Sequence, residues 1–444
     1  MRQLFIERDG FLRIALTQEG AMKALRVLKD PQQPLEGDIY QATIKNVSSA
    51  QSAVFVDLGT GRNAYLYVRS PKALGKYHVG DRLPVEILRS QVGKKGAKVT
   101  EAVSLTDGDL VVMAGRGHSY SRNLDRSEFE RIHGAPPEVP GFHILYRSDS
   151  LNIEPHHLNL RVQGVAQRLR QILDQAEQTL VPGRLYRDLG YLEDLLQDGV
   201  DMIHSNDPVI SASLRQQGYV VTEYPDFVHL FASHGLEQAV DRLRHKTVAL
   251  PGGGTLVIEE TEALTAIDVN SAARGSQGHR LSAYELNETA LRASLEQIEL
   301  RSLSGIIVID FVAMEREADA QRLWQTASEL TESMRPLTKA YPLTELGLMQ
   351  IARRRRGESV NQFLFSREGT RKVPVSPTYL YKLIRIKLDD PAWSMKQFEI
   401  TLDPIYTLER QALEQLITQD YPDYQIRWEF RRDVDTVKVV PILS

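Results

Sequence analysis

The sequence of 444 residues contains no cysteine, which excludes disulfides and zinc sites with thiolate ligands. It also lacks an apolar run long enough to span a bilayer and any segment that resembles a signal peptide. We therefore expect a cytoplasmic protein without a membrane segment. The formal net charge is only −4, so a polyanionic partner would have to be bound by local basic patches. The length leaves room for about three domains with buried cores.

A strand–helix–strand pattern lies near the centre of the chain. A short apolar segment, Ala263–Ile267, leads to Asp268 and Asn270, and residues two apart in a strand point to the same face. After an amphipathic helix, Ile306–Val312 is apolar on both faces except at Asp310, which predicts a strand buried in a covered sheet. This order predicts two parallel strands whose aspartates converge near one edge of the sheet.

Two adjacent carboxylates repel each other, and a divalent cation removes that cost. Oxygen ligands favour Mg²⁺, with Mn²⁺ as an alternative, over zinc or copper. Asn270 would hold one carboxylate in its metal-binding rotamer. Alternatively, Asp268 and Asn270 form an Asx-turn at a strand end, and Asp310 ends its own ladder. Each residue alone favours the alternative, whereas the three together favour a metal site.

Five short strands with alternating polarity over residues 36–113 predict a small closed barrel of the OB type. The alternation places Phe55 on the outer face of one strand, and Tyr65 and Tyr67 on the outer face of the next. Lys95 lies on the neighbouring hairpin, where phosphates would pass. A lone exposed aromatic is usually a rim-packing residue. Several on one face beside lysines favour binding of single-stranded nucleic acid.

Four other residues are candidates for contacts with phosphates. Arg147 and Ser148 lie at the end of a predicted strand, where they would either donate to a phosphate or form a solvated helix cap. Arg353 begins a run of four arginines. That run is either a solvated helix end or a site for phosphates flanking a scissile bond, and both interpretations stay open. Arg301, just before the second aspartate strand, is a further cationic candidate.

The runs TEALTAIDVNSA, GIIVIDFVAM and GLMQIARRR resemble the signature of the ribonuclease E/G family. The barrel, the LYRS strand, LPGGGTLVIEETEALTAID and the C-terminal subdomain also follow that family's order, so the likeness covers most of the chain. It implies a hydrolytic endoribonuclease that cuts single-stranded, often A/U-rich RNA. The implied setting is RNA decay and the maturation of ribosomal and transfer RNA precursors, with products that carry 5′-phosphate and 3′-hydroxyl ends.

The resemblance also implies roles for single residues. It assigns three of them to the Mg²⁺ centre: Asp268, Asp310 and the supporting Asn270. It assigns three to the barrel surface that holds an RNA base: Phe55, Tyr65 and Lys95. It assigns two to the receipt of a 5′-monophosphate: Arg147 and Ser148. Asn123 stands where a second sensor arginine is often found, which weakens the expectation of 5′-end sensing.

The fold implied by the resemblance is α/β and multidomain. An interrupted RNase H-like scaffold carries an inserted OB barrel of the S-one type, a 5′-sensor segment, a deoxyribonuclease-I-like catalytic subdomain and a small C-terminal α+β subdomain. The expected boundaries are 1–35 and 191–254 for the scaffold, 36–113 for the barrel, 114–190 for the sensor, 255–365 for the catalytic subdomain and 366–444 for the C-terminal subdomain.

One departure from the family pattern concerns zinc. Members usually carry a CxxC-type link before the small subdomain, through which two chains share a metal, and the matching segment FLFSREGT has no thiol. We therefore expect no zinc, and a homodimer of this chain would not be linked by zinc. The sequence stops soon after the small subdomain, which favours the short G-type form of the family.

Two other functions are compatible with parts of the pattern. A non-catalytic RNA-binding protein acting in RNA maturation would use the barrel and the sensor, but it has no need of three convergent polar groups on strands. A metal-dependent enzyme for a small phosphorylated substrate would not need an extended stacking face. The complete set of residues favours the nuclease.

Overall fold

The computed structural model describes the whole chain except residues 29–33, 91–95, 108–109, 123, 189, 197–198, 272–281, 355–358, 369–370, 374, 394, 433, 435 and 443–444. In the described part, no helix combines the length and apolar composition needed to cross a membrane. The chain forms two compact units. One comprises Met1–Pro31 and Leu195–Ser444, and the other comprises Gln32–Asp194. The molecule is a mixed α/β protein with several sheets.

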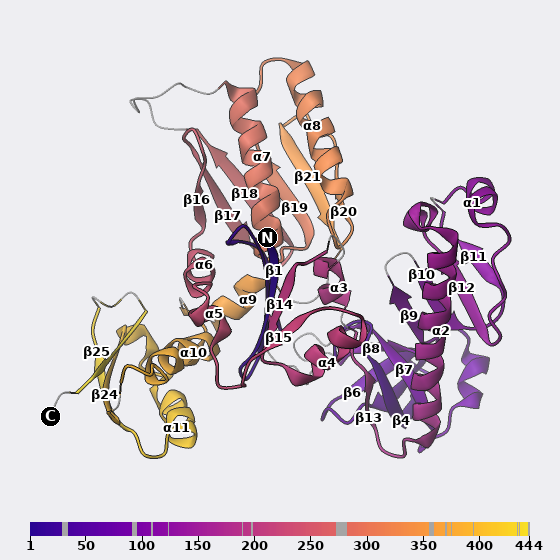
Figure 1. Ribbon diagram of the computed structural model, residues 1–444, viewed down its shortest axis with the longest axis horizontal. Helices are drawn as coiled ribbons and strands as arrows, with labels where there is room; N and C mark the ends of the chain where they lie inside the picture. The colour runs from indigo at the N-terminus through magenta and orange to yellow at the C-terminus, as the bar shows by residue number, and fades with distance from the viewer. Residues whose placement is uncertain are drawn as a thin grey trace. The chain divides into compact units, whose positions relative to one another are not determined.

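The N-terminal sheet of the first unit joins strands that are far apart in sequence (Figure 1). Its order is β15–β14–β1–β2–β3, and β1 runs parallel to β14 with Gln3 opposite Met202. The strands are β1 (Arg2–Arg8), β2 (Leu12–Gln18), β3 (Ala21–Leu28), β14 (Met202–Ser205) and β15 (Val221–Glu223). The helices near them in sequence are α3 (Gly190–Leu196), α4 (Pro208–Gln216), α5 (Leu230–Ser233) and α6 (Glu237–Arg242).

The second sheet of this unit contains the strand–helix–strand pattern, in the order β16–β17–β18–β19–β21–β20. The strands are β16 (Thr247–Ala249), β17 (Thr255–Glu260), β18 (Leu264–Asn270), β19 (Gly305–Asp310), β20 (Thr338–Ala340) and β21 (Leu348–Arg353). The helices are α7 (Ala283–Leu300) and α8 (Glu317–Glu332). A capping box starts α7, because Ser282 and Glu285 each accept a hydrogen bond from the other's backbone N–H. Figure 1 shows both helices on one face of the sheet.

The C-terminal elements share a hydrophobic core with the N-terminal sheet. This core extends from Phe5 and Leu25 to Tyr379, Phe398 and Val439. The helices are α9 (Val360–Leu364), α10 (Pro377–Leu388), η3 (Pro404–Tyr406) and α11 (Arg410–Asp420). The strands are β22 (Ser366–Glu368), β23 (Arg371–Val373), β24 (Gln397–Leu402), β25 (Gln425–Phe430) and β26 (Val437–Pro441). The last three form a sheet in which β24 is central.

The second unit contains the predicted barrel. Its five strands are β4 (Ile39–Ser48), β5 (Ala53–Asp57), β6 (Asn63–Tyr67), β7 (Arg82–Arg89) and β8 (Lys98–Thr100). Pairing runs β4–β5–β6–β8–β7 and returns to β4, so the sheet is closed. Inward residues such as Val54, Val56 and Leu66 are buried in its core. The expectation of an OB-like closed barrel is confirmed. A short helix, η1 (Pro71–Lys76), and strand β13 (Gly183–Tyr186) complete this part.

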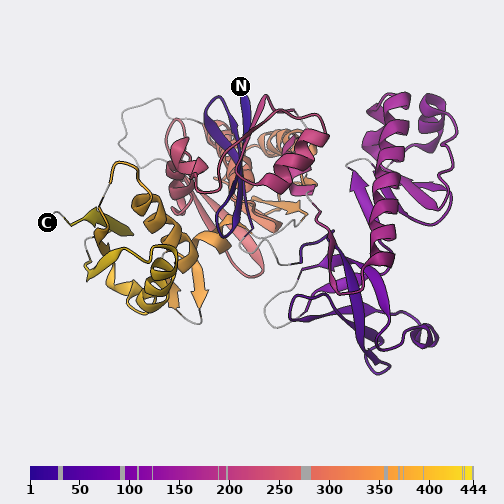
Figure 2. The ribbon, with the colours of Figure 1, turned by 60° about the horizontal axis from the view of Figure 1, so that its bottom comes forward.

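The rest of the second unit is a four-stranded sheet with a long helix. The sheet consists of β9 (Ser104–Asp107), β10 (Leu110–Ala114), β11 (His118–Tyr120) and β12 (Phe142–Tyr146). The helices are α1 (Arg126–His133), η2 (Ser148–Asn152) and α2 (Pro155–Gln178). α2 contacts strands of this sheet and of the barrel sheet, and its long course is visible in Figure 2. Its buried stripe includes Val165, Leu169 and Ile172, which are spaced so that they share one face of the helix.

Candidate active site and RNA-binding surfaces

The two central aspartates lie side by side on neighbouring strands. β18 and β19 are parallel, and their register places Asp268 directly opposite Asp310. Adjacent strands are about 4.8 Å apart, and paired positions point to the same face, so the two carboxylates share one small area of surface. The predicted convergence of the aspartates is confirmed as a matter of geometry.

The environment of this pair differs from the expectation of a sheet covered on both faces. Residues such as Ile267 and Ile309 are buried against α7 and α8, whereas Asp268, Asp310 and Ile306 are exposed on the opposite face. The sheet is therefore covered by helices on one face, and the aspartates are accessible to solvent. The expectation of a sheet covered on both faces was wrong, because outward-facing residues of β19 such as Ile306 are apolar although they are exposed.

Asn270 lies on the same exposed face, two residues after Asp268. Its Nδ2 donates to Asp268 Oδ2 at 2.8 Å, as the supporting role requires. The glycine turn before β17 packs closely against the backbone of Asn270. A Cβ on Gly254, whose φ is +93°, would lie 2.5 Å from the backbone oxygen of Asn270. The run LPGGGT thus forms a tight hairpin between β16 and β17, and at Gly254 only glycine permits this close approach.

The donor set fits a hard divalent cation. In the described part of the chain, neither Asp268 nor Asp310 takes part in an ion pair that would neutralise it. Two adjacent carboxylates repel each other, and a bound Mg²⁺ would remove that repulsion. Within the same ranges no group of three or more His, Asp or Glu side chains could hold a metal. Mg²⁺ usually keeps several water ligands beside one or two protein carboxylates.

A second structural amide supports the strand end from the helix side. Asn287 on α7 is fully buried, and its Oδ1 accepts from the Val312 N–H at 3.0 Å. Its Nδ2 donates to the Val312 carbonyl at 2.7 Å. The chain just after Asp310 is thereby fixed to α7. Sequence analysis missed Asn287, although a polar residue on the apolar stripe of a predicted helix is a signal worth attention.

The outer face of the barrel presents the expected aromatic residues. Phe55 and Tyr65 are register partners on β5 and β6, so their side chains are neighbours on one face. Tyr65 is 36% exposed, and Tyr67 on the same strand is 53% exposed. Lys98 is opposite Tyr65 on β8, which brings a cation into the same row. Lys95 lies outside the described residues.

The two predicted sensor residues directly follow β12. Arg147 caps η2 and Ser148 begins it, and both side chains are partly buried. The Arg147 carbonyl accepts from the N–H and the hydroxyl of Ser150, so this turn has a fixed backbone. Asn123 is not among the described residues. Receipt of a terminal phosphate at this turn stays a prediction.

The structure argues against direct RNA contact by Arg301. Its side chain is 2% exposed, and its guanidinium donates to the carbonyls of Leu243 and His245, both at 2.8 Å. Burial lowers the pKa of Arg301 to about 10. Arg301 therefore ties the end of α7 to the segment after α6.

Arg353 is also buried. Its guanidinium donates to the carbonyls of Ile298 and Leu303 at 3.1 and 3.0 Å, and it pairs with Glu299. This arginine joins β21 to the end of α7, so the expectation that it contacts RNA directly is not supported.

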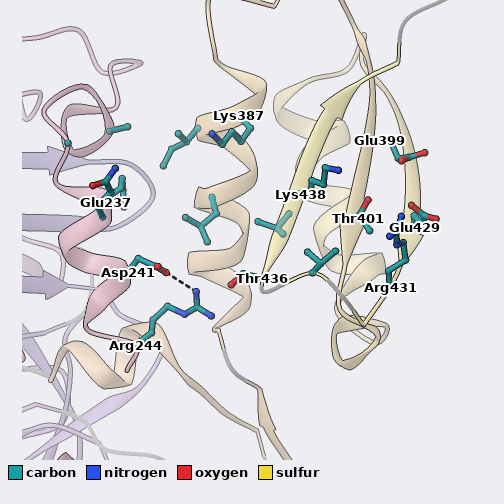
Figure 3. Close-up of a pocket in the computed structure, with 17 residues that line it drawn as sticks. Glu237, Asp241, Arg244, Lys387, Glu399, Thr401, Glu429, Arg431, Thr436 and Lys438 are labelled. Atoms are coloured by element: carbon teal, nitrogen blue, oxygen red, sulfur yellow. Dashed lines mark hydrogen bonds and ion pairs between the residues drawn. The ribbon is translucent and has the colours of Figure 1, made fainter. Parts of the chain in front are cut away.

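A cavity of about 710 Å³ in the described part of the chain is lined by neither Asp268 nor Asp310. It lies between α6, α10 and the C-terminal sheet (Figure 3). Its charged lining is mixed in sign and consists of Glu237, Asp241, Arg244, Lys387, Glu399, Glu429, Arg431 and Lys438. Asp241 and Arg244 pair with each other at 2.7 Å. A wall with balanced charges does not select a polyanion, so this cavity is not the candidate site.

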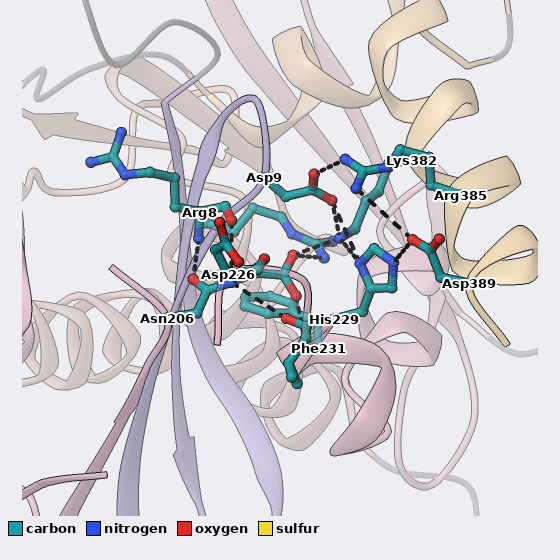
Figure 4. A network of polar contacts seen from close by, with 12 residues as sticks. Arg8, Asp9, Asn206, Asp226, His229, Phe231, Lys382, Arg385 and Asp389 are labelled. Atoms are coloured by element: carbon teal, nitrogen blue, oxygen red, sulfur yellow. Dashed lines mark hydrogen bonds and ion pairs between the residues drawn. The ribbon is translucent and has the colours of Figure 1, made fainter. Parts of the chain in front are cut away.

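A buried polar network connects β1 with α10 (Figure 4). Glu7 contacts Arg13 at 2.6 Å and Lys382 at 3.0 Å, and it accepts from a backbone N–H at 3.0 Å. Burial opposes its ionisation, but Arg13 and Lys382 outweigh that effect and hold the pKa of Glu7 at about 2. Asp9 also pairs with Lys382. Because these carboxylates have cationic partners, the network is structural and not a second metal site.

The sequence was also compared with those of known proteins. The sequence model of the Ribonuclease E/G family matches residues 104–356, which are 253 of the 444 residues. Ribonuclease G of Haemophilus influenzae is 24% identical over 418 residues, and the match covers 84% of each chain. Ribonuclease G of Escherichia coli (strain K12) gives the same identity and coverage. Ribonuclease E of Synechocystis sp. is 26% identical over 358 residues, covering 73% of this chain and 53% of that protein.

Proposed function

Because this chain belongs to the ribonuclease E/G family and is thus an endoribonuclease, we propose that it hydrolyses single-stranded, A/U-rich RNA in a Mg²⁺-dependent reaction. The products would carry 5′-phosphate and 3′-hydroxyl ends. The substrates would include ribosomal and transfer RNA precursors and RNAs undergoing decay. The observation that carries this proposal is the pair Asp268 and Asp310. The two residues are register partners that face solvent, and the Asn270 amide donates a hydrogen bond to Asp268.

The roles of the residues follow from their placement. Asp268 and Asp310 would hold Mg²⁺, or Mn²⁺ in its place, and Asn270 would keep the Asp268 carboxylate oriented. The bound ion would supply a Lewis acid for the scissile phosphate and lower the pKa of a bound water. A single strand of RNA would lie along the exposed face of this sheet. The chain contains no cysteine, so no thiolate-ligated zinc takes part, and any homodimer would assemble without it.

The barrel would present the RNA. Phe55 and Tyr65 offer adjacent aromatic surfaces on which bases stack, and Lys98 would contact the backbone. Lys95 would join this surface. Arg147 and Ser148 would receive a 5′-monophosphate at the start of η2.

The finer fold assignments belong to the same proposal. The N-terminal sheet, completed by strands from both sides of the inserted unit, would be the interrupted RNase H-like scaffold. The sheet with the aspartates would be the deoxyribonuclease-I-like subdomain, and the four-stranded sheet with α2 would be the 5′-sensor. The boundaries predicted from the sequence stay predictions, as does cytoplasmic localisation.

The test is cleavage of a 5′-monophosphorylated, A/U-rich oligoribonucleotide by the protein and by Asp310→Asn, with Mg²⁺ and with EDTA. We expect internal cuts that require Mg²⁺ and that disappear in the variant, because one of the two anionic ligands is lost. Full cleavage by Asp310→Asn would refute the assignment. Tight binding without cleavage by either protein would favour a non-catalytic RNA-binding function.

A further inference from the structure

The edge of the sheet that carries the aspartates presents a lysine and a tyrosine together. β20 alternates, with Thr338 and Ala340 buried toward the helices and Lys339 exposed on the other face. Tyr341 continues this alternation and is 40% exposed. Both side chains therefore lie on the face that carries Asp310.

The register connects this pair with the aspartates. The Tyr341 N–H donates to the Gln350 carbonyl at 2.9 Å, and Gln350 is opposite Val308 on β19. Val308 is two residues before Asp310. Two strand spacings of about 4.8 Å and two residue rises of about 3.4 Å put the Tyr341 backbone about 12 Å from that of Asp310. This distance is a few nucleotides along a single strand.

The chemistry of the pair suits a nucleotide. The Lys339 ammonium lies 5.1 Å from the centroid of the Tyr341 ring. An exposed aromatic ring offers a surface to any unpaired base, and the adjacent cation offers a partner for its phosphate. The positions between this pair and the aspartates carry uncharged side chains, namely Val308, Leu348 and Gln350. A polyanion lying there would therefore cross uncharged side chains before it reached Asp310.

We infer that Tyr341 and Lys339 form a base-stacking site for single-stranded RNA on the aspartate sheet, separate from the aromatic surface of the barrel. It would hold a nucleotide a few positions from the phosphate placed at the two aspartates. The inference rests on the proposed function, because it places RNA on this sheet face. It also gives a reason for single-strand preference, since a base must be unpaired to stack on the ring.

The test measures binding, so that it does not depend on catalysis. In an Asp310→Asn background, dissociation constants are measured for an A/U-rich oligoribonucleotide and for a series with one abasic position each. Tyr341→Ala should weaken binding of the intact RNA by roughly 5- to 140-fold, the effect of losing one stacked base. Tyr341→Phe should bind as the parent does. Phe227→Ala, which removes a 71% exposed aromatic in the same unit, is the matched control and should change nothing.

The abasic series identifies the stacked base. At one position, removal of the base should weaken binding by the parent and abolish the difference between the parent and Tyr341→Ala. Lys339→Ala should reduce the salt dependence of binding, with a logarithmic slope smaller by about 0.7. Equal binding by the parent and Tyr341→Ala would overturn the inference, as would a Tyr341→Ala effect that persists at every abasic position. Absence of Mg²⁺-dependent cleavage by the unmodified protein would instead count against the proposed function alone.

Discussion

The contact between Asn270 and Asp268 gives a quantitative prediction for the metal centre. Asn270→Ala removes the donor that lies 2.8 Å from the Asp268 carboxylate and leaves both aspartates in place. The carboxylate then gains rotamer freedom, which must be lost again when the ion binds. We therefore expect weaker Mg²⁺ binding without loss of the site.

The magnitude follows from the strength of this hydrogen bond. A hydrogen bond to a charged group contributes about 1.5–3 kcal/mol, and removal of a residue that orients a metal ligand typically costs about 10- to 100-fold in affinity or activity. Asn270 is exposed, so water replaces part of the lost contact. We expect the lower end of the range, an increase of about tenfold in the Mg²⁺ concentration for half-maximal cleavage.

The assay is the initial rate of oligoribonucleotide cleavage over a Mg²⁺ titration. Asn270→Ala should approach the rate of the unmodified protein at saturating Mg²⁺ and fall well below it at limiting Mg²⁺. Gln425→Ala removes an exposed amide from the C-terminal sheet and is the control. An unchanged Mg²⁺ dependence in Asn270→Ala would refute the supporting role, and a rate that no Mg²⁺ concentration restores would assign Asn270 a direct part in the reaction.

Four other predictions concern the barrel, the strand end and the buried network. Phe55→Ala should weaken RNA binding by about 1–3 kcal/mol with an unchanged Mg²⁺ dependence, measured by fluorescence anisotropy and Mg²⁺ titration; no loss of affinity would contradict the stacking role. Asn287→Leu should lower the free energy of unfolding by about 1–3 kcal/mol, because Val312 loses both hydrogen bonds to the Asn287 amide. It should also raise the Mg²⁺ concentration needed for half-maximal cleavage. A change in stability alone would assign Asn287 a purely structural role. Lys382→Met should lower the free energy of unfolding by about 3–5 kcal/mol, because Glu7 stays buried and loses one of its two cationic partners. In the unmodified protein the pKa of Glu7 is lowered from 4.5 to about 2. Its ionised carboxylate therefore contributes about 3 kcal/mol to the free energy of unfolding above pH 4.5, and this contribution is lost as the pH falls toward 2. Urea denaturation over this pH range measures the loss, and a free energy of unfolding that does not change with pH would contradict the prediction.

Local pattern was sufficient to predict where the aspartates meet. A strand–helix–strand order predicts parallel neighbours, and the register of Asp268 and Asp310 confirms that they are paired. The same pattern did not reveal that one sheet face is open. Ile306 is 55% exposed, although an isoleucine in an apolar run is normally assigned to a core.

The fate of the arginines could not be deduced from the sequence for a different reason. Arg301 is held by carbonyls of Leu243 and His245, which are 58 and 56 residues away. Whether a lone arginine faces solvent or ends in such a pocket depends on the tertiary structure. The barrel was easier, because the alternation of Val54, Phe55 and Val56 alone separates its inner from its outer face.

The pairing of β1 with β14 has a consequence for synthesis of the chain on the ribosome. Gln3 meets Met202, so at about 5–20 residues per second the first strands wait roughly 10–40 s for their neighbour. The unit at Gln32–Asp194 emerges during that interval and has core clusters of its own. Asp9 waits longer, since Lys382 follows it by 373 residues. Interrupted translation would therefore release chains with a complete barrel unit and an N-terminal sheet that still lacks Lys382, the cation that Glu7 and Asp9 share.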